Sequence, residues 1–285
     1  MLNHDIAKNV TDKIIASLES GVAPWVRPWK AENSGMPYNM ATLKTYRGIN
    51  VALLSLNSFA SNAWLTYKQA QELGANVRKG EKGSMIVFYK PWKIEDKNNP
   101  DSEGKTVPVL KSFAVFNREQ IDGLPALPAR TEQPRPSHEE ANAVLAQATI
   151  RHGGARAFYS LQGDYIQLPE AGDFIDHPSY YATALHELTH WTGHKDRLAR
   201  EYGKRFGDTA YSREELVAEM GAAFLCAHLG IDGRLQHAEY IGSWIDVLKS
   251  DKRAIITAAS AAQKAFDFCV NREQSSIETI ETIAA

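Results

Sequence analysis

The segment ALHELTHWTGHKD limits what this chain can fold into more than any other stretch. His186 and His190 are four residues apart, so on an α-helix their imidazoles project from one face. At that spacing two ring nitrogens can share one metal ion, and Glu187 lies beside the first histidine as a general base. Gly193 follows as a predicted helix end, and the flanking YYATAL indicates burial. The segment therefore predicts a metal-binding helix inside a packed unit.

A catalytic zinc centre requires a third protein ligand, and two acidic residues compete for that place. Asp196 follows the predicted helix end, in the pattern H-E-x-x-H-x-x-G-x-x-D. Glu215 lies in SREELVAE, with Glu219 one helical turn further along, so one carboxylate can bind the ion while the other holds a ligand histidine. Because ELVAE resembles the third-ligand helix of the gluzincin metallopeptidases, we favour Glu215. Asp196 remains the alternative ligand, and the run of acids in EELVAE leaves other registers open.

The expected ion is Zn²⁺, although another divalent metal such as Mn²⁺ fits the same donors. The arrangement indicates a hydrolase of peptide bonds, in which Glu187 is the catalytic acid/base that takes a proton from the attacking water. The competing interpretation is a structural helix whose histidine spacing is coincidental. The helical context and the distant acidic helix favour the metal site.

The front of the chain predicts mixed helices and strands. Ile6, Val10, Ile14 and Leu18 recur every four residues and predict a helix that ends at Gly21. The segment KTYRGINVALLSLNSF predicts a turn and a buried helix, and NAWLTYKQAQELG predicts a second helix with Asn62 as its cap and Gly74 as its stop. The alternating stretch MIVFY predicts a strand paired with VPVLKSFAVFNREQI.

Residues 124–137 contain four prolines and few apolar residues, which is typical of a semi-rigid linker. Beyond them, RAFYSLQGDYIQLP predicts two strands, the second of which could form a rim for pairing with an extended peptide. The metal-binding helix comes next, and AEYIGSWIDVLKS and KRAIITAASAAQKAFDFCV predict two helices near the end. The sequence therefore predicts an α+β protein with a front domain at residues 1–123, a linker at 124–137 and a metal-binding domain at 138–285.

Charge divides between the two predicted domains. Residues 1–123 carry 16 basic against 12 acidic side chains, whereas residues 124–285 carry 16 against 22. Between residues 25 and 93 the ratio is 10 basic to 3 acidic, and four of the six tryptophans lie in the same stretch. Alternating rings and cations are what sequence-tolerant binding of single-stranded nucleic acid requires, because bases stack on rings and phosphates attract cations.

The predicted nucleic-acid contacts are therefore the aromatic, basic and amide side chains of this stretch: Trp25, Trp29, Lys30, Lys44, Tyr46, Arg47, Asn50, Trp64, Arg78, Lys79, Lys82, Tyr89 and Lys90. The competing interpretation is that the rings belong to the core, with Trp64 and Tyr67 three apart on a helix. We favour a nucleic-acid surface, because the two Pro-Trp pairs of APWVRPWK indicate a surface loop.

The remaining features place limits on the compartment. No apolar run is long enough to span a bilayer, so a membrane partner is not expected. The beginning MLNHDIAKNV lacks the pattern of a secretory signal, and Cys226 and Cys269 are too few for a disulfide framework. We therefore expect a reducing, cytoplasmic location.

Several separated motifs occur together in one order: GVAPWVRPWK, KTYRGIN, AWLTYKQAQELGANVRKGEKG and HELTHWTGHKDRL…EELVAE. Over roughly residues 5–270 they resemble the ArdC-type antirestriction proteins of conjugative plasmids, and the front part is also similar to the N-terminal portion of the plasmid primase TraC. The resemblance implies a single-stranded-DNA-binding domain, a zincin-like metallopeptidase domain and protection of incoming plasmid DNA from restriction. It also implies His186, His190 and Glu215 as metal ligands, with Glu187 catalytic.

Two other functions remain in competition. One is a DNA-binding protein that protects without proteolysis and whose metal is structural. The other is a metallopeptidase that cleaves a host restriction enzyme subunit or another protein. Substitution of Glu187 separates these alternatives.

Overall fold

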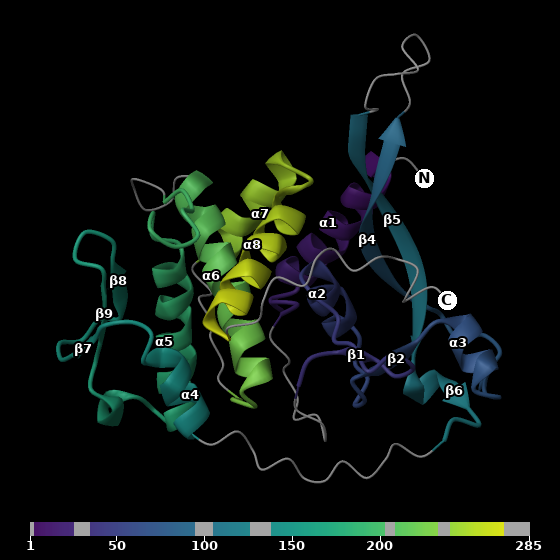
Figure 1. The fold of residues 1–285 in the computed structure, drawn as a ribbon, viewed down its shortest axis with the longest axis horizontal. Helices are drawn as coiled ribbons and strands as arrows, with labels where there is room; N and C mark the ends of the chain where they lie inside the picture. Colours follow the sequence, from purple (N-terminus) through teal and green to yellow (C-terminus); the bar gives the residue numbers. More distant parts are fainter. Residues whose placement is uncertain are drawn as a thin grey trace.

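The computed structural model describes residues 3–25, 35–94, 105–125, 138–202, 209–232 and 240–270. Trp29, Lys30 and residues 126–137 of the predicted linker lie outside the described residues, and the side chain of Lys90 is not described either. The described part combines helices with small sheets, as expected for the α+β class. Figure 1 shows the long β4–β5 hairpin near one end of the molecule, the small β7–β9–β8 sheet at the other, and helices between them.

The front part of the chain is built around a four-stranded sheet of order β1-β2-β5-β4. The 17-residue helix α1, the short helices α2, α3 and η1, and a two-stranded β3–β6 ribbon accompany it. The elements are α1 (Asn3–Glu19), β1 (Tyr38–Asn39), α2 (Ile49–Ser55), β2 (Ala63–Leu65), α3 (Tyr67–Glu72), β3 (Asn76–Val77), β4 (Ser84–Ile94), β5 (Lys105–Asn117), η1 (Arg118–Gln120) and β6 (Ile121–Asp122).

The predicted N-terminal helix is confirmed as α1. Its four periodic apolar residues are all buried, and Gly21 has a φ of 78° just after the helix, a conformation that glycine adopts without steric cost. The predicted strand pair is confirmed as β4 and β5, which pair antiparallel along the whole of β4.

The prediction of one helix through NAWLTYKQAQELG is wrong in its first half. Ala63–Leu65 form β2, which pairs with β1 and β5, and α3 begins only at Tyr67. The cap is Thr66, whose hydroxyl accepts a hydrogen bond from Gln69 N while the Gln69 side chain accepts one from Thr66 N. Asn62 instead precedes the strand and is buried. The predicted stop at Gly74 is confirmed.

The rear part is mainly helical, with one three-stranded sheet. Its elements are α4 (His138–Leu145), β7 (Ile150–His152), β8 (Phe158–Ser160), β9 (Tyr165–Leu168), η2 (Ala171–Asp173), α5 (His177–Thr192), α6 (Thr209–His228), α7 (Ile241–Ser250) and α8 (Ala254–Cys269). The strand DYIQLP was expected to form an open rim, and this is wrong. It is β9, the middle strand, with β7 and β8 on either side.

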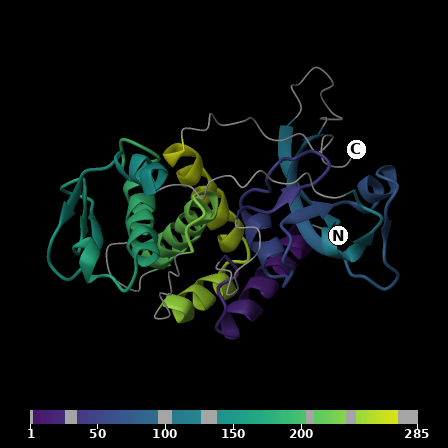
Figure 2. The same ribbon diagram turned by 90° about the horizontal axis from the view of Figure 1, so that it is seen from below.

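The front and rear parts share one hydrophobic core. Figures 1 and 2 both place α1 and α2 beside α7 and α8, and the largest buried cluster contains residues of all four helices. Trp25 meets Trp244 edge-to-face, with ring centroids 5.8 Å apart. Polar contacts add to the junction, because Arg47 pairs with Asp267 and Gly48 N donates to the Gln263 amide oxygen. In the described part of the chain, no helix has the length and apolar character needed to cross a membrane.

Candidate metal centre and nucleic-acid interface

The candidate metal centre is carried by two neighbouring helices, α5 and α6. Helix α5 begins where Asp176 accepts a hydrogen bond from Ser179 N at 2.8 Å, and it ends at Gly193. Its second half is almost entirely buried against α6 and α8. The two helices approach closely because Gly221 on α6 has no side chain. A Cβ there would lie 2.5 Å from Thr189 Cγ2.

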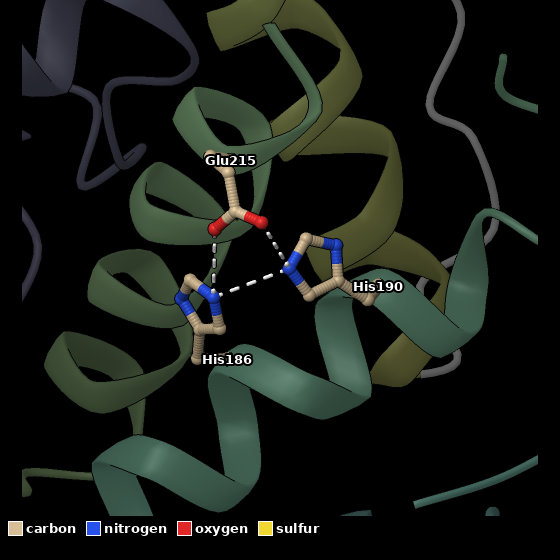
Figure 3. A group of neighbouring side chains, drawn as sticks. All are labelled: His186, His190 and Glu215. Atoms are coloured by element: carbon tan, nitrogen blue, oxygen red, sulfur yellow. Dashed lines mark hydrogen bonds and ion pairs between the residues drawn. The ribbon is translucent and has the colours of Figure 1, made fainter. Parts of the chain in front are cut away.

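This packing brings three potential ligands together (Figure 3). His186 Nε2 lies 3.2 Å from His190 Nε2, and Glu215 reaches between the rings, with its oxygens 3.5 Å and 3.6 Å from those two nitrogens. All three side chains are buried, and their ligand atoms lie within 4.8 Å of one another. The arrangement presents two imidazole nitrogens and one carboxylate to a common point.

Two further carboxylates face the outer nitrogens of the same rings. Glu219 Oε2 lies 3.5 Å from His186 Nδ1, the supporting place considered for it from the sequence. Glu214 Oε1 lies 3.2 Å from His190 Nδ1, a contact that the sequence analysis missed. A carboxylate that accepts the Nδ1 proton fixes the ring orientation and leaves Nε2 free to bind a metal.

Arg200 holds Glu214 in place. Its guanidinium donates to Glu214 Oε1 at 2.8 Å and to Oε2 at 3.0 Å. It also donates to the Thr189 carbonyl and the Thr192 hydroxyl, and thereby ties the carboxylate to the end of α5. No spacing rule points to Arg200, because it lies in the chain after the helix and only the fold returns it to the site.

The electrostatics of the centre favour positive charge at the rings. Burial alone would lower the pKa of His186, but hydrogen bonds to Glu215 and Glu219 outweigh it and raise that pKa to about 10. Burial likewise opposes the charge on His190, yet hydrogen bonds to Glu214 and Glu215 raise its pKa to about 9. Although burial would raise the pKa of Glu215, its contacts with both histidines lower it. A cation placed at the two Nε2 atoms would be neutralised by Glu215, while the Nδ1 atoms keep their contacts with Glu219 and Glu214.

The donor set therefore fits a divalent metal ion. Two imidazoles and a carboxylate form the ligand set of many catalytic zinc sites, and each ring here has its own supporting acid. Glu187 is buried beside His186 on the same helix. Asp196, the alternative third ligand, is not brought into this group. Its side chain is 72% exposed, and Oδ2 lies 3.4 Å from His194 Nδ1.

The predicted nucleic-acid contacts divide by exposure. Lys44, Lys79, Lys82 and Tyr89 are exposed. Arg78 is also exposed, but its guanidinium is engaged by Glu81 and Asp122 and shapes the loop before β4.

The other described residues of that set are partly or fully buried. Trp25 packs against Trp244, while Tyr46 and Trp64 lie in a second apolar cluster. Asn50 pairs with the edge of β4, donating to Val87 O and accepting from Val87 N, both at 2.8 Å. Base contacts by these four side chains would require the core to open, and half-buried Arg47 is held by Asp267.

Comparisons with known proteins find matches for both the front and the rear part of the chain. Residues 4–116 match the model of the N-terminal domain of the anti-restriction factor ArdC, and residues 138–261 match the model of a zincin-like metallopeptidase. The protein y4eC of Sinorhizobium fredii is 39% identical over 99% of this chain and 96% of its own length.

Two DNA primases TraC of Escherichia coli are 42% and 43% identical over 94% and 95% of this chain. The chain spans only 20% and 27% of their lengths.

Solved structures of the antirestriction protein ArdC from plasmid R388 are also similar to this chain. The metal-free structure matches with a TM-score of 0.81 and 42% identity, over 94% of this chain and 97% of that one. The Mn(II)-bound structure matches with a TM-score of 0.77 and 42% identity, over 95% and 98%. With the ligand cluster, these matches indicate a divalent metal at the centre. The chain belongs to the ArdC antirestriction family, with an ArdC N-terminal domain followed by a zincin-like domain.

Proposed function

We propose that this chain is a plasmid-encoded antirestriction protein that binds single-stranded DNA and protects incoming conjugative DNA from host restriction. Its rear domain carries a zinc-dependent metallopeptidase site, and it acts in the cytoplasm. The observation that carries the proposal is the buried His186–His190–Glu215 cluster in a chain of the ArdC family. The basic, aromatic front domain supports the DNA-binding part.

In this proposal His186, His190 and Glu215 hold the ion, and Glu219 and Glu214 orient the two imidazoles. A divalent ion bound there polarises a carbonyl and lowers the pKa of water. Glu187 acts as the base that accepts a proton from the attacking water and then passes it to the leaving amine. Arg200 keeps Glu214, and through it His190, in a fixed orientation.

The partner in the front domain is single-stranded DNA, because plasmid DNA enters a recipient in conjugation as a single strand. The partner of the rear domain is a polypeptide, with a subunit of a host restriction enzyme as the candidate substrate. The proposal thus joins a DNA-binding surface to a peptidase that acts on a protein near that DNA.

The Glu187→Ala variant tests this assignment in the full chain. Metal content and oligo-dT binding should match those of the wild type, because Glu187 is neither a proposed ligand nor in the front domain. Cleavage of unfolded polypeptide and of restriction enzyme subunits should fall by about 10²–10⁴-fold, the usual contribution of a positioned general base. Protection of transferred DNA in a restricting recipient should fall with it. Glu139→Ala, at an exposed glutamate of α4, serves as the control.

Full protection by Glu187→Ala would show that the proteolytic account of antirestriction is wrong. Protection would then rest on the DNA-binding half alone, with the metal in a structural role. Failure of the wild-type protein to protect transferred DNA would overturn the antirestriction assignment itself.

A further inference from the structure

A group of phenylalanine rings reaches the surface at the margin of the second hydrophobic cluster of the front domain. The buried centre of that cluster is Tyr46, Leu54, Trp64, Ile86 and Val115. Phe59, Phe88 and Phe113 pack against it and are only half-buried. We call these three residues the phenylalanine margin. The sequence pattern singled out tryptophans and tyrosines instead, of which Trp25, Trp64 and Tyr46 lie in the core.

The strand register places Phe88 and Phe113 of the margin on one face of the β4–β5 pair. Ile86 is opposite Phe113, and Phe88 is opposite Lys111, so all four side chains project to the same side. The Phe88 and Phe113 rings meet edge-to-face with centroids 6.0 Å apart. Lys111 is exposed directly beside Phe88.

Phe59 extends the margin toward the centre of the sheet. Its ring meets Trp64 edge-to-face at 5.6 Å, with an interplanar angle of 83°. The buried Trp64 thus supports Phe59 from below rather than facing solvent. Rings held against a packed core keep their orientation at little entropic cost, which favours them as a binding platform.

Lysine side chains lie on this face and close to the start of β4. Lys111 lies on it, and exposed Lys82 comes two residues before β4 begins. In the sequence, residues 25–93, which include all of β4 except Ile94, carry 10 basic against 3 acidic side chains. One of those acids, Glu81, is engaged by Arg78 and by the Gln120 amide. The face therefore joins apolar rings to the exposed cation of Lys111.

We infer that the phenylalanine margin with Lys111 is the surface on which this chain stacks the unpaired bases of single-stranded DNA. The inference rests on the proposed function and names the site for it. Duplex DNA does not expose base faces, so the rings select single strands, whereas Lys111 contacts a phosphate without regard to sequence. Buried Trp64 and Tyr46 then support the platform and do not contact bases.

The test uses the full chain and fluorescein-labelled oligo-dT, with affinity measured by anisotropy. The Phe88→Leu/Phe113→Leu double variant keeps apolar volume but removes two stacking faces. Affinity should fall at least about tenfold, since one stacked base contributes about 1–3 kcal/mol, or roughly 5–150-fold. Phe88→Tyr keeps the ring and should bind like the wild type. Tyr67→Leu is the matched control, because it removes an exposed ring of α3 that packs against Phe116. Side chains alternate along β5, so Phe116 projects from the face opposite to that of Phe113.

Lys111→Ala provides a second test that leaves the core intact. The slope of log affinity against log salt concentration should become shallower by about 0.7, the value for one phosphate contact on a single strand. Lys264→Ala, at an exposed lysine of α8, should leave the slope unchanged.

The outcomes separate the inference from the proposed function. Wild-type protein that does not bind oligo-dT, or binds duplex equally well, would overturn both. If the double leucine variant binds oligo-dT as tightly as the wild type and Lys111→Ala leaves the salt slope unchanged, the inference alone is overturned. If the double variant proves unfolded by circular dichroism, the Lys111→Ala slope decides.

Discussion

Residue spacing predicts part of the metal centre but not all of its contacts. The i,i+4 pair and its neighbour Glu187 follow directly from the helical period, and the structure does bring His186, His190 and Glu215 together. Which acid supports which ring does not follow from spacing. Glu214 and Glu219 differ by five positions on α6, and their partners depend on how α6 is rotated against α5.

Protonation of the two histidines predicts how the centre responds to pH. Neighbouring glutamates raise their pKa values to about 10 and about 9 from the ordinary 6.5, so the ion-free pair holds protons more tightly than free imidazoles do. A metal ion must displace those protons. The apparent affinity for Zn²⁺ should therefore rise between pH 6 and 8, by up to about tenfold per displaced proton per pH unit. Competition with a chromophoric chelator measures it.

That pH response has a clear control. In Glu219→Gln the His186 ring loses a carboxylate that raises its pKa, so that pKa should fall. The rise of zinc affinity with pH between pH 6 and 8 should then be shallower. An affinity that stays flat between pH 6 and 8 in the wild-type protein would contradict the assignment of neutral imidazoles as ligands.

At the scale of elements, strong periodicity was a reliable guide and isolated apolar runs were not. Helix α1 and the β4–β5 hairpin follow from repeated patterns over many residues. The segment AWL was predicted as helix but is β2, because pairing with β1 and β5 outweighs local helix propensity. The place of β9 in its sheet could not be predicted, since a strand pattern does not say which neighbours cover its edges.

The contact between α5 and α6 predicts the effect of one methyl group. In Gly221→Ala the new Cβ would lie 2.5 Å from Thr189 Cγ2, so the helices must move apart. The free energy of unfolding should fall by about 1–3 kcal/mol, as for other overpacked cores, and metal affinity should fall because Glu215 moves with α6. Urea unfolding with and without zinc measures both effects.

Gly242→Ala is the matched control, because a Cβ at that helical position meets nothing within 4 Å. It should leave stability unchanged or raise it slightly, since alanine favours helix over glycine. Equal unfolding midpoints for the two variants would show that Gly221 does not set the helix spacing.

At the scale of the whole molecule, composition divides the chain into a basic front and an acidic rear, yet the core does not divide there. Helices α1 and α2 of the front pack with α7 and α8 of the rear. Helix α8 also packs with α5 and α6, which carry the ligands. Such a contact between distant segments leaves no local signal, because each helix shows only that it has an apolar face, not which helix covers it. The predicted boundaries at residues 123 and 138 remain predictions.

The proposed function of the rear domain depends on one ion held by residues from two separate helices. Metal content per chain, measured by mass spectrometry after dialysis with zinc, tests this most directly. The wild-type protein and Asp196→Ala should each bind one ion per chain, whereas Glu215→Ala should bind tenfold or more weakly and lose it on dialysis. A Glu215→Ala protein that retains its ion while Asp196→Ala loses it would contradict the account.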